Sequence, residues 1–364
     1  MRVVDRLIAF ASPKVALRRA LRLSDQGKPG EAFALFTRLA RAGIIEAEYR
    51  VARAYLEGAG VPPSRVEGAR WLQRAAGRGH LEAQSLLATL CVHGLAEGIK
   101  TGQPDRLFAD DKPGEPDFAS ALAWARQAAE AGSAKAQAVL AYVLTCAPEP
   151  LRDLAEAHRW YRHSAATGCP EGCLGYALSL APRTHDEAGR REVAEHLHRA
   201  ADGVPQAQLS YGRMLADGRG VTADPDGARA WIARAAAAGL TEAQVALAEM
   251  MVNGRGGPRD PATAVELFEK AADHGHSGAM FALGALHAGG HDLPEDRTAA
   301  RRWFRAAAER GHGQAQLMLA RYLAAGAGGE PDPAQARSWL EQACAQGIEA
   351  SQAALAALPS PPPQ

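Results

Sequence analysis

Apolar and polar residues follow one another along this chain with the period of an α-helix, in short stretches separated by glycine-containing turns. Between Gly239 and Gly254, the residues that share one helix face are Ala243, Gln244, Leu247, Ala248 and Met251. This spacing predicts a short amphipathic helix, termed helix A. The same slots recur after Gly79, Gly203 and Gly311, so we expect the same helix at each of these places.

Turn glycines of the form Ala-x-x-Gly, with Cys344 in place of the alanine at the last of them, divide the chain at a nearly constant interval. Six of the eight steps between successive glycines are 36 residues long, one is 35 and one is 53. A fixed period of this length predicts a solenoid or array. The nine glycines are Gly43, Gly79, Gly132, Gly168, Gly203, Gly239, Gly275, Gly311 and Gly347.

The tryptophans give an independent test of this register. All six lie eight residues before a turn glycine, at Trp71, Trp124, Trp160, Trp231, Trp303 and Trp339. Repeats without Trp place a bulky pair in or beside this slot, namely Leu35-Phe36, His196-Leu197 and Leu267-Phe268. A large side chain at helical spacing is typical of core packing rather than of a functional row. The slot therefore belongs to a second packed helix, termed helix B.

The connection from helix A to helix B carries its own signals. Aspartates recur there at intervals of 36 residues, and three of the four precede proline, at Asp224, Asp260, Asp296 and Asp332. This pattern predicts helix N-caps rather than catalytic acids. The preceding Gly-x-Gly runs end helix A in left-handed geometry and lack the strand and the Gly-Lys-Ser/Thr ending of a phosphate loop. The ninth residue after each turn glycine is small, which predicts a close helix crossing.

Together these residues read A-x-x-W-hydrophobic-x-x-A-A-x-x-G-H-x-x-A-Q-x-x-L-A, then G-x-G-V-x-x-D, which resembles the Sel1-like repeat, a relative of the tetratricopeptide (TPR) repeats. The resemblance covers roughly residues 31–358. It implies an all-α fold, a right-handed α-solenoid of about eight Sel1-like or TPR-like helix pairs with an N-terminal helical hairpin and a C-terminal capping helix. It also implies a scaffold or adaptor role, in bacteria often linked to envelope, exopolysaccharide or signalling pathways.

The same register sets the expected domain organisation. Residues 1–43 form N-terminal capping helices, residues 44–358 form the repeat solenoid, and residues 359–364 form a proline-rich disordered tail. The long step of 53 residues contains an insertion at 94–116, which is too rich in Gly, Pro, Asp and Lys for a long helix. It is either a binding loop or a tolerated mobile loop, and the side chains best able to make contacts are Arg106, Phe108, Asp110 and Asp111.

Charge and hydropathy narrow the range of partners. The chain has 41 basic and 41 acidic residues, so its overall balance gives no electrostatic footprint for nucleic acid or an anionic membrane. It has no run of 18 apolar residues, so we expect no transmembrane segment. Asp5 and Arg6 interrupt any signal-peptide core, and residues 1–14 are interpreted as a short amphipathic cap. The alternative is a peripheral membrane protein held by this segment.

The remaining chemistry-bearing residues suggest neither a metal site nor a catalytic site. Five cysteines form no repeat-wise pairing, which favours a reducing compartment and the cytoplasm. The chain thereby departs from the cysteine-rich secreted branch of the Sel1 family, with which β-lactam binding is associated. The Ser-x-x-Lys motif that would supply a nucleophile for β-lactams is not found in a supporting context. His80, His276 and His312 occupy the family slot after the turn glycine, which explains them without metal. We expect no cofactor, no metal ion and no catalytic residue.

By analogy with TPR packing, the sixth and tenth residues after each turn glycine line the concave groove. The sixth position is mostly apolar and includes Tyr49 and Phe281, and the tenth includes Arg53, Tyr142, Arg213, Glu249 and Arg321. An apolar floor with spaced arginines suits a protein or peptide partner with some acidic character. The alternative is ordinary solvated helix positions. The sequence thus predicts a non-enzymatic interaction scaffold in the bacterial cytoplasm, the alternative being an enzyme accessory or a hydrolase-like, β-lactam-binding activity.

Overall fold

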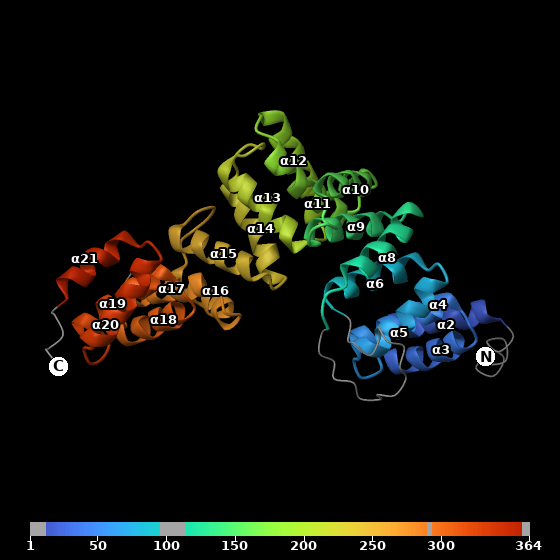
Figure 1. The fold of residues 1–364 in the computed structure, drawn as a ribbon, viewed down its shortest axis with the longest axis horizontal. Coiled ribbons are helices and arrows are strands. Elements are labelled where there is room, and N and C mark those ends of the chain that lie inside the picture. Colours follow the sequence, from blue (N-terminus) through green and yellow to red (C-terminus); the bar gives the residue numbers. More distant parts are fainter. Residues whose placement is uncertain (1–11, 95–113, 290–292, 359–364) are drawn as a thin grey trace. The chain divides into compact units, whose positions relative to one another are not determined.

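Short antiparallel helices make up the protein in the computed structural model, which describes residues 12–94, 114–289 and 293–358 (Figure 1). These three ranges contain nineteen α-helices, one short 3₁₀ turn and no strand. The prediction of an all-α fold is therefore confirmed. Among the helices of these ranges, none is both long enough and apolar enough to cross a bilayer.

The helices alternate between the two types expected from the sequence. The helix A series is α4 (Ile45–Glu57), α6 (Leu81–Val92), α9 (Ala134–Cys146), α11 (Pro170–Leu180), α13 (Pro205–Asp217), α15 (Thr241–Asn253), α17 (Ser277–His287) and α19 (Gly313–Ala325). The helix B series is α5 (Arg65–Gly77), α8 (Phe118–Glu130), α10 (Leu154–Ala166), α12 (Glu187–Ala201), α14 (Pro225–Ala237), α16 (Pro261–Asp273), α18 (Arg297–Glu309) and α20 (Pro333–Ala345).

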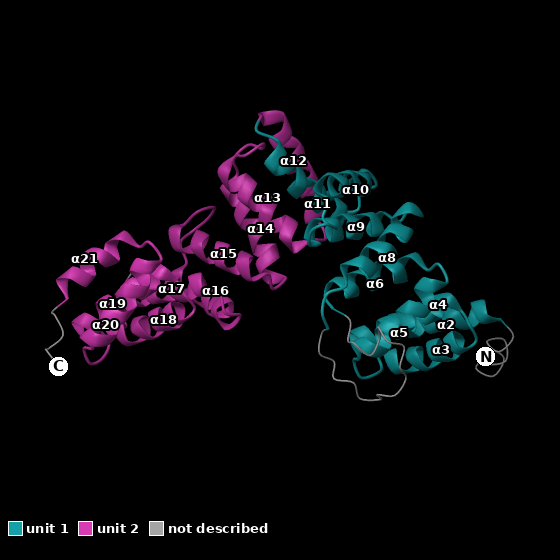
Figure 2. Cartoon of the chain, in the orientation of Figure 1, with its two compact units in different colours: residues 1–185 teal, residues 186–364 magenta. Residues whose placement is uncertain are grey.

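Three further helices complete the described chain. A hairpin of α2 (Pro13–Asp25) and α3 (Pro29–Arg41) precedes the repeats, and α21 (Glu349–Ala357) follows them. The expected arrangement of about eight helix pairs, an N-terminal hairpin and a C-terminal helix is thus confirmed. The chain divides into two compact units, residues 1–185 and residues 186–364 (Figure 2). Alanine and leucine dominate the buried positions of both.

One backbone hydrogen bond closes the turn from helix A to helix B in repeat after repeat. The N–H of the residue that caps helix B donates to the carbonyl of the twelfth residue after the turn glycine, as from Asp224 to Leu215 at 2.9 Å. The same bond joins Asp117 to Cys91 at 2.9 Å, although the insertion separates these two residues. The extra residues therefore leave the repeat junction intact.

The aspartates at these turns cap helix B, as the sequence predicts. A side-chain oxygen of Asp260 accepts a hydrogen bond from the N–H of Thr263 at 3.0 Å, and Asp224, Asp296 and Asp332 make equivalent bonds. These bonds satisfy N–H groups that lack an acceptor within the first turn of the helix. The hydrogen bond to Thr263 is also the main reason that the pKa of Asp260 is lowered.

The two glycines of the Gly-x-Gly exit have different tasks. Gly254 ends α15 in the left-handed region with φ of 67°, which is the role that the sequence predicts. Gly256 also has a positive φ, and a Cβ placed on it would lie 2.0 Å from the carbonyl oxygen of Pro225. Pro225 begins α14, the preceding helix B. The second glycine therefore lets the loop of one repeat touch the backbone of the repeat before it.

The same close contact recurs in both units. A Cβ on the second glycine would meet the first turns of α3, α12 and α18 at 2.2–2.4 Å, from Gly60, Gly220 and Gly328. Helix packing depends on small residues in the same way at the ninth position after the turn glycine. There, a Cβ on Gly284 would lie 2.5 Å from the ring of Phe304, which confirms the predicted close crossing.

The tryptophan slot lies at the edge of the core rather than at its centre. Trp71, Trp231 and Trp303 are half-buried and pack against core clusters. The following residue lies deeper, since Phe304 and Phe268 are at most 2% exposed. The predicted packing role of the slot is confirmed, and the guanidinium groups of Arg74 and Arg234 cover the rings of Trp71 and Trp231.

A buried glutamine links consecutive helix pairs. The side-chain amide of Gln208 donates to the carbonyl of Ala201, at the end of the preceding helix B, at 2.8 Å. Gln84, Gln137 and Gln316 make equivalent bonds. The last carbonyls of a helix have no partner within it, so this bond satisfies one of them inside the core.

The repeat contact at Gly256 gives a direct test. Gly256→Ala should lower the free energy of unfolding by roughly 2–4 kcal/mol, because it adds a steric clash to the cost of a left-handed backbone. Gly239→Ala is the matched control, since Gly239 also has a positive φ but no atom within 4 Å of its Cβ position. The control should lose only about 1 kcal/mol. Urea unfolding followed by circular dichroism measures both, and equal losses would contradict the role assigned to Gly256.

Candidate functional site

The sixth-position residues are built into the junctions between repeats. The Tyr49 ring stacks on His80 with centroids 4.6 Å apart, and the Phe281 ring stacks on His312 at 4.8 Å. Both aromatic side chains are half-buried, whereas Leu209 and Leu317 in the same position are fully buried. This position therefore contributes mainly to packing, and partner binding by Tyr49 and Phe281 stays a prediction.

The histidines that follow the turn glycines, which include the two stacked ones, are helix caps. Nδ1 of His80, His276 and His312 accepts a hydrogen bond from the N–H three residues later, at 3.3, 3.0 and 3.2 Å. This bond leaves the proton of a neutral imidazole on Nε2. In His80, Nε2 therefore donates to Glu46, 2.9 Å away. These histidines were assigned from the sequence to the slot after the turn glycine, and the structure shows that in this slot they cap helix A.

The tenth-position residues differ between the two units. In residues 186–364, Arg213, Glu249 and Arg321 are exposed on α13, α15 and α19. Within the described ranges, none of these three side chains makes an ion pair or a side-chain hydrogen bond. In residues 1–185, Arg53 pairs with Glu57 on the same helix, and Tyr142 on α9 is 43% exposed.

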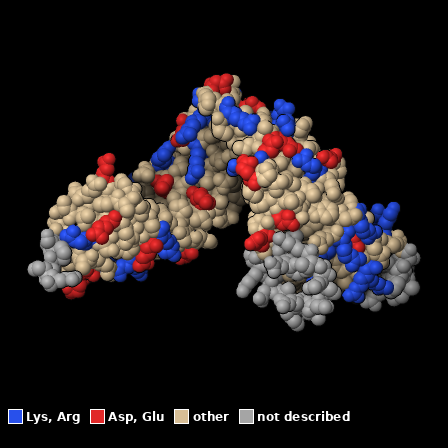
Figure 3. All heavy atoms as spheres, in the orientation of Figure 1, with Lys and Arg blue, Asp and Glu red and all other residues tan. Residues whose placement is uncertain are grey.

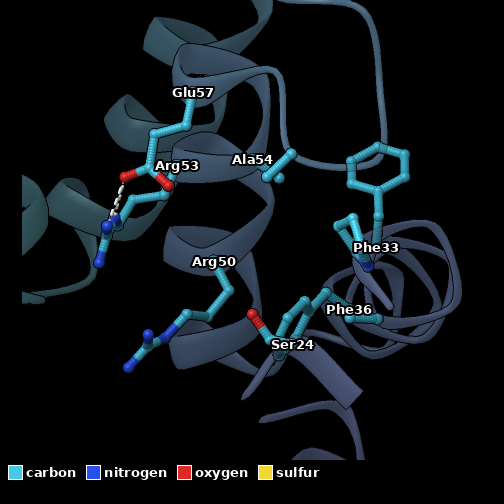
Figure 4. A pocket seen from close by; sticks show the side chains of 10 residues that line it. Ser24, Phe33, Phe36, Arg50, Arg53, Ala54 and Glu57 are labelled. Atoms are coloured by element: carbon cyan, nitrogen blue, oxygen red, sulfur yellow. Dashed lines mark hydrogen bonds and ion pairs between the residues drawn. The ribbon is translucent and has the colours of Figure 1, made fainter. Parts of the chain in front are cut away.

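A small pocket lies beside Arg53, between α3 and α4 (Figure 4). Its volume is about 90 Å³. Figure 4 shows Phe33 and Phe36 on one side of it and Arg50, Arg53 and Glu57 on the other. The pocket can therefore accept a small apolar group next to a polar rim, a combination common in recognition sites.

The charges at this rim balance one another. Nε of Arg50 donates to Glu46 at 2.6 Å, and Nε of Arg53 donates to Glu57 at 2.8 Å. The hydrogen bond from His80 is the largest influence on Glu46 and, with the Arg50 bond, keeps the pKa of this carboxyl below its usual value against the effect of burial. Glu57 raises the pKa of Arg53. The rim thus holds paired side chains, suited to recognition rather than to proton transfer.

A buried charge in the same helix was not expected from the sequence. Glu48 is 1% exposed and forms ion pairs with Arg74 at 3.2 Å and Arg78 at 3.3 Å, both from α5 or its C-terminal end. It occupies the slot that holds Gln84 and Gln208 in other repeats. The departure from glutamine was the available signal. Glu48 ties α4 to the following helix, α5, whereas the glutamine in this slot of other repeats bonds to the preceding helix B.

Other predicted features fall elsewhere. Arg106, Phe108, Asp110 and Asp111, residues 1–11 and the tail 359–364 lie outside the described residues. All five cysteines are free, and the Cys173 thiol is buried against the carbonyl of Ala165. In the part of the chain that the structure describes, no three His, Cys, Asp or Glu side chains gather in a way that could hold a metal ion.

Comparison with known proteins places this architecture in a family. The Sel1 repeat model matches more than half of the chain, at residues 45–80, 107–133, 134–168, 205–240, 241–276, 277–312 and 313–348. A Sel1 repeat protein from Oxalobacter formigenes is 28% identical, with a TM-score of 0.57, and the match covers 92% of this chain and 93% of that one.

Two further relatives extend the comparison. The c5321 protective antigen of uropathogenic Escherichia coli, described as displaying an SLR fold, is 25% identical with a TM-score of 0.55, over 96% of this chain and 80% of that one. Chitin synthase regulatory factor 3 of Schizosaccharomyces pombe is 29% identical over 212 residues. That match takes in 56% of this chain but only 21% of the fungal protein, so the chain spans about a fifth of its curated relative.

The histidine cap at His312 predicts a pH dependence of stability. Burial is the main cause that lowers the pKa of His312 below 6.5, so the unfolded chain binds a proton more readily than the folded one. Stability should therefore fall as the pH decreases through 6.5 towards the folded pKa. His312→Asn keeps a capping side chain that does not titrate, and should reduce the loss between pH 7.5 and 5.5 by up to about 1 kcal/mol. Urea unfolding at the two pH values measures this, and an unchanged loss would show that the His312 cap does not titrate.

Proposed function

The chain belongs to the Sel1 repeat family, and from this premise we propose that it is a non-enzymatic scaffold of the bacterial cytoplasm that binds a partner protein or peptide. Repeat proteins of the Sel1 and TPR type are generally protein-interaction scaffolds. Their stacked helix pairs offer extended surfaces on which one partner can contact several repeats. The fungal relative is itself named as a regulatory factor, which supports a role exerted on another protein.

The observation that carries this proposal is the row of tenth-position side chains on helix A of residues 186–364. Arg213, Glu249, Ala285 and Arg321 follow one another at intervals of 36 residues, all exposed. Within the described ranges, the three charged side chains of this row make no ion pair and no side-chain hydrogen bond. A partner can therefore bind to this row without breaking a hydrogen bond or an ion pair within the protein.

The neighbouring residues give this row an apolar base. Val245, Ala246, Phe281, Ala282 and Met318 are half-buried on α15, α17 and α19. A segment that crosses these helices would meet charges in the order positive, negative, neutral and positive. The complementary partner is an extended segment with acidic residues opposite Arg213 and Arg321.

The first unit offers a different surface. Tyr142 on α9 and Leu178 on α11 occupy the tenth position of consecutive repeats and are 43% and 53% exposed. Large exposed apolar side chains in neighbouring positions favour contact with apolar groups of a partner. Arg53 and the insertion residues Arg106, Phe108, Asp110 and Asp111 are further candidate contacts in this unit.

The hydrolase-like alternative has less support. It needs a nucleophile or an acid and a base that converge on one cavity. The ionisable side chains that line the pocket of Figure 4 are instead paired, Arg50 with the nearby Glu46 and Arg53 with Glu57. This pairing favours the scaffold interpretation at that pocket.

A pair of charge reversals tests the row. Arg213→Glu combined with Arg321→Glu should reduce the recovery of the partner from native cell lysate at least about tenfold, because each arginine then repels an acidic segment. The matched control is Arg191→Glu with Arg305→Glu, which makes the same charge change on helix B of the same unit and should leave recovery unchanged. Circular dichroism should show the same helicity and melting for both variants.

The outcome also separates the row from the insertion. A variant with residues 95–115 replaced by a short repeat-type loop should retain the partner if the row is the site. Loss of the partner with this variant, together with full recovery by the double arginine variant, would assign recognition to the insertion instead. A folded bait that recovers no partner at all would count against the scaffold function itself.

A further inference from the structure

The N-terminal hairpin is strongly basic, which the neutral balance of the whole chain conceals. Residues 12–42 hold seven Lys and Arg residues against two acidic ones. Figure 3 shows Lys and Arg side chains gathered at the end of the molecule where Figure 1 places the first helices. Within the described ranges, five of the seven make no ion pair, namely Lys14, Arg18, Arg19, Arg22 and Arg41.

An apolar groove of about 470 Å³ runs between the two helices of this hairpin. Ala16 and Leu39 at its base are buried, and Leu23 and Leu35 are half-buried. The exposed side chains along it are Arg19 on α2 and Glu31 and Arg38 on α3. Glu31 lies 3.9 Å from Lys28, so its charge is partly offset. The groove thus combines an apolar floor with a rim of net positive charge.

The repeat pattern shows what shape this groove fits. Leu35 lies eight residues before Gly43, the slot that Trp71 occupies in the next repeat. Trp71 packs against a core cluster formed by α2, α3 and α4, so its slot joins a core to which the preceding helix pair contributes Phe36 and Leu39. No described helix precedes α2. The groove at Leu35 therefore has the form of a surface that elsewhere in the fold receives a helix.

We propose that this groove binds an amphipathic helix of a partner protein, with apolar residues on one face and Asp or Glu along its flanks. The apolar face would pack on Leu23, Leu35 and Leu39, and the acidic flanks would meet Arg19 and Arg38 in charge-assisted hydrogen bonds. This interaction lies outside the helix A row of the proposed function and does not depend on it.

Charge and shape favour this occupant over two others. Residues 1–11 of the chain carry Arg2 and Arg6 against one acidic residue, Asp5, so their net charge has the same sign as the rim. A bilayer surface would meet the exposed arginines but would not reach the leucines at the base of the groove. An acidic amphipathic helix satisfies both the floor and the rim.

The probe is a labelled amphipathic peptide of about 15 residues, with Leu on one face and Glu on both flanks. The full-length protein should bind it in fluorescence anisotropy, and should not bind the same peptide with Lys in place of every Glu. Arg19→Glu and Leu35→Ala should each weaken binding by about tenfold. Arg18→Glu changes the charge equally on the same helix but outside the groove, so it should have little effect.

Each of the remaining outcomes would overturn the proposal. Equal losses from Arg18→Glu and Arg19→Glu would indicate a general basic surface, and no binding of the Glu peptide would remove the groove as a helix site. Deletion of residues 1–11 that raised peptide affinity tenfold would identify that segment as the occupant. Binding only to phosphatidylcholine vesicles with about 30 mol% phosphatidylserine would identify a membrane surface. Arg213→Glu with Arg321→Glu should leave peptide binding unchanged, which keeps this test separate from that of the helix A row.

Discussion

Contact between the backbones of consecutive repeats is the constraint on which the rest of each unit depends. The loop after helix A touches the first turn of the preceding helix B at Gly60, Gly220, Gly256 and Gly328, and no side chain fits between them. In these four copies, helix A must therefore end, and helix B begin, at the same place in the repeat. The 36-residue period of the sequence expresses this requirement. The small ninth residue allows helix A and helix B to approach closely, and the glutamine hydrogen bond joins helix A to the preceding helix B.

The features that the sequence predicted are those with local signals. The left-handed glycines of the Gly-x-Gly exits, the aspartate caps and the helical spacing of the apolar residues each depend on a few neighbouring positions, and all were found. The exposure of Arg213, Glu249 and Arg321 also follows from helical spacing, and the pairing of Arg53 with Glu57 is an i, i+4 relation visible in the sequence. The ion pairs of Glu48 were missed because Arg74 and Arg78 come from another helix. The stacks of Tyr49 and Phe281 were missed because they form only when two repeats meet.

The two units differ in how closely their repeats follow the common sequence pattern. Residues 186–364 keep regular copies from α13 to α19, and one exposed row on helix A varies in charge while the packing slots stay alike. Residues 1–185 depart from the pattern more often, at the buried Glu48, at the insertion, at the 3₁₀ turn Ala181–Arg183 and in the basic hairpin. A repeat protein can change such positions one at a time, because each helix pair depends mainly on its immediate neighbours. The resulting surfaces are therefore chemically distinct although the helix pairs that carry them are alike.

The hydrogen bond between Asp117 and Cys91 has a consequence for how such a protein can acquire new parts. It joins the two ends of the inserted segment at the distance found in repeats without any insertion. The length of the segment between these ends can therefore change without shifting the helices on either side. Closing the longer loop costs only about 1 kcal/mol more conformational free energy than closing the short loop of the other repeats. The loop between α6 and α8 is therefore a position that tolerates insertions. A foreign epitope, a cleavage site or a small folded module could be exchanged here during evolution or by design, while the helices on either side stay in the same frame.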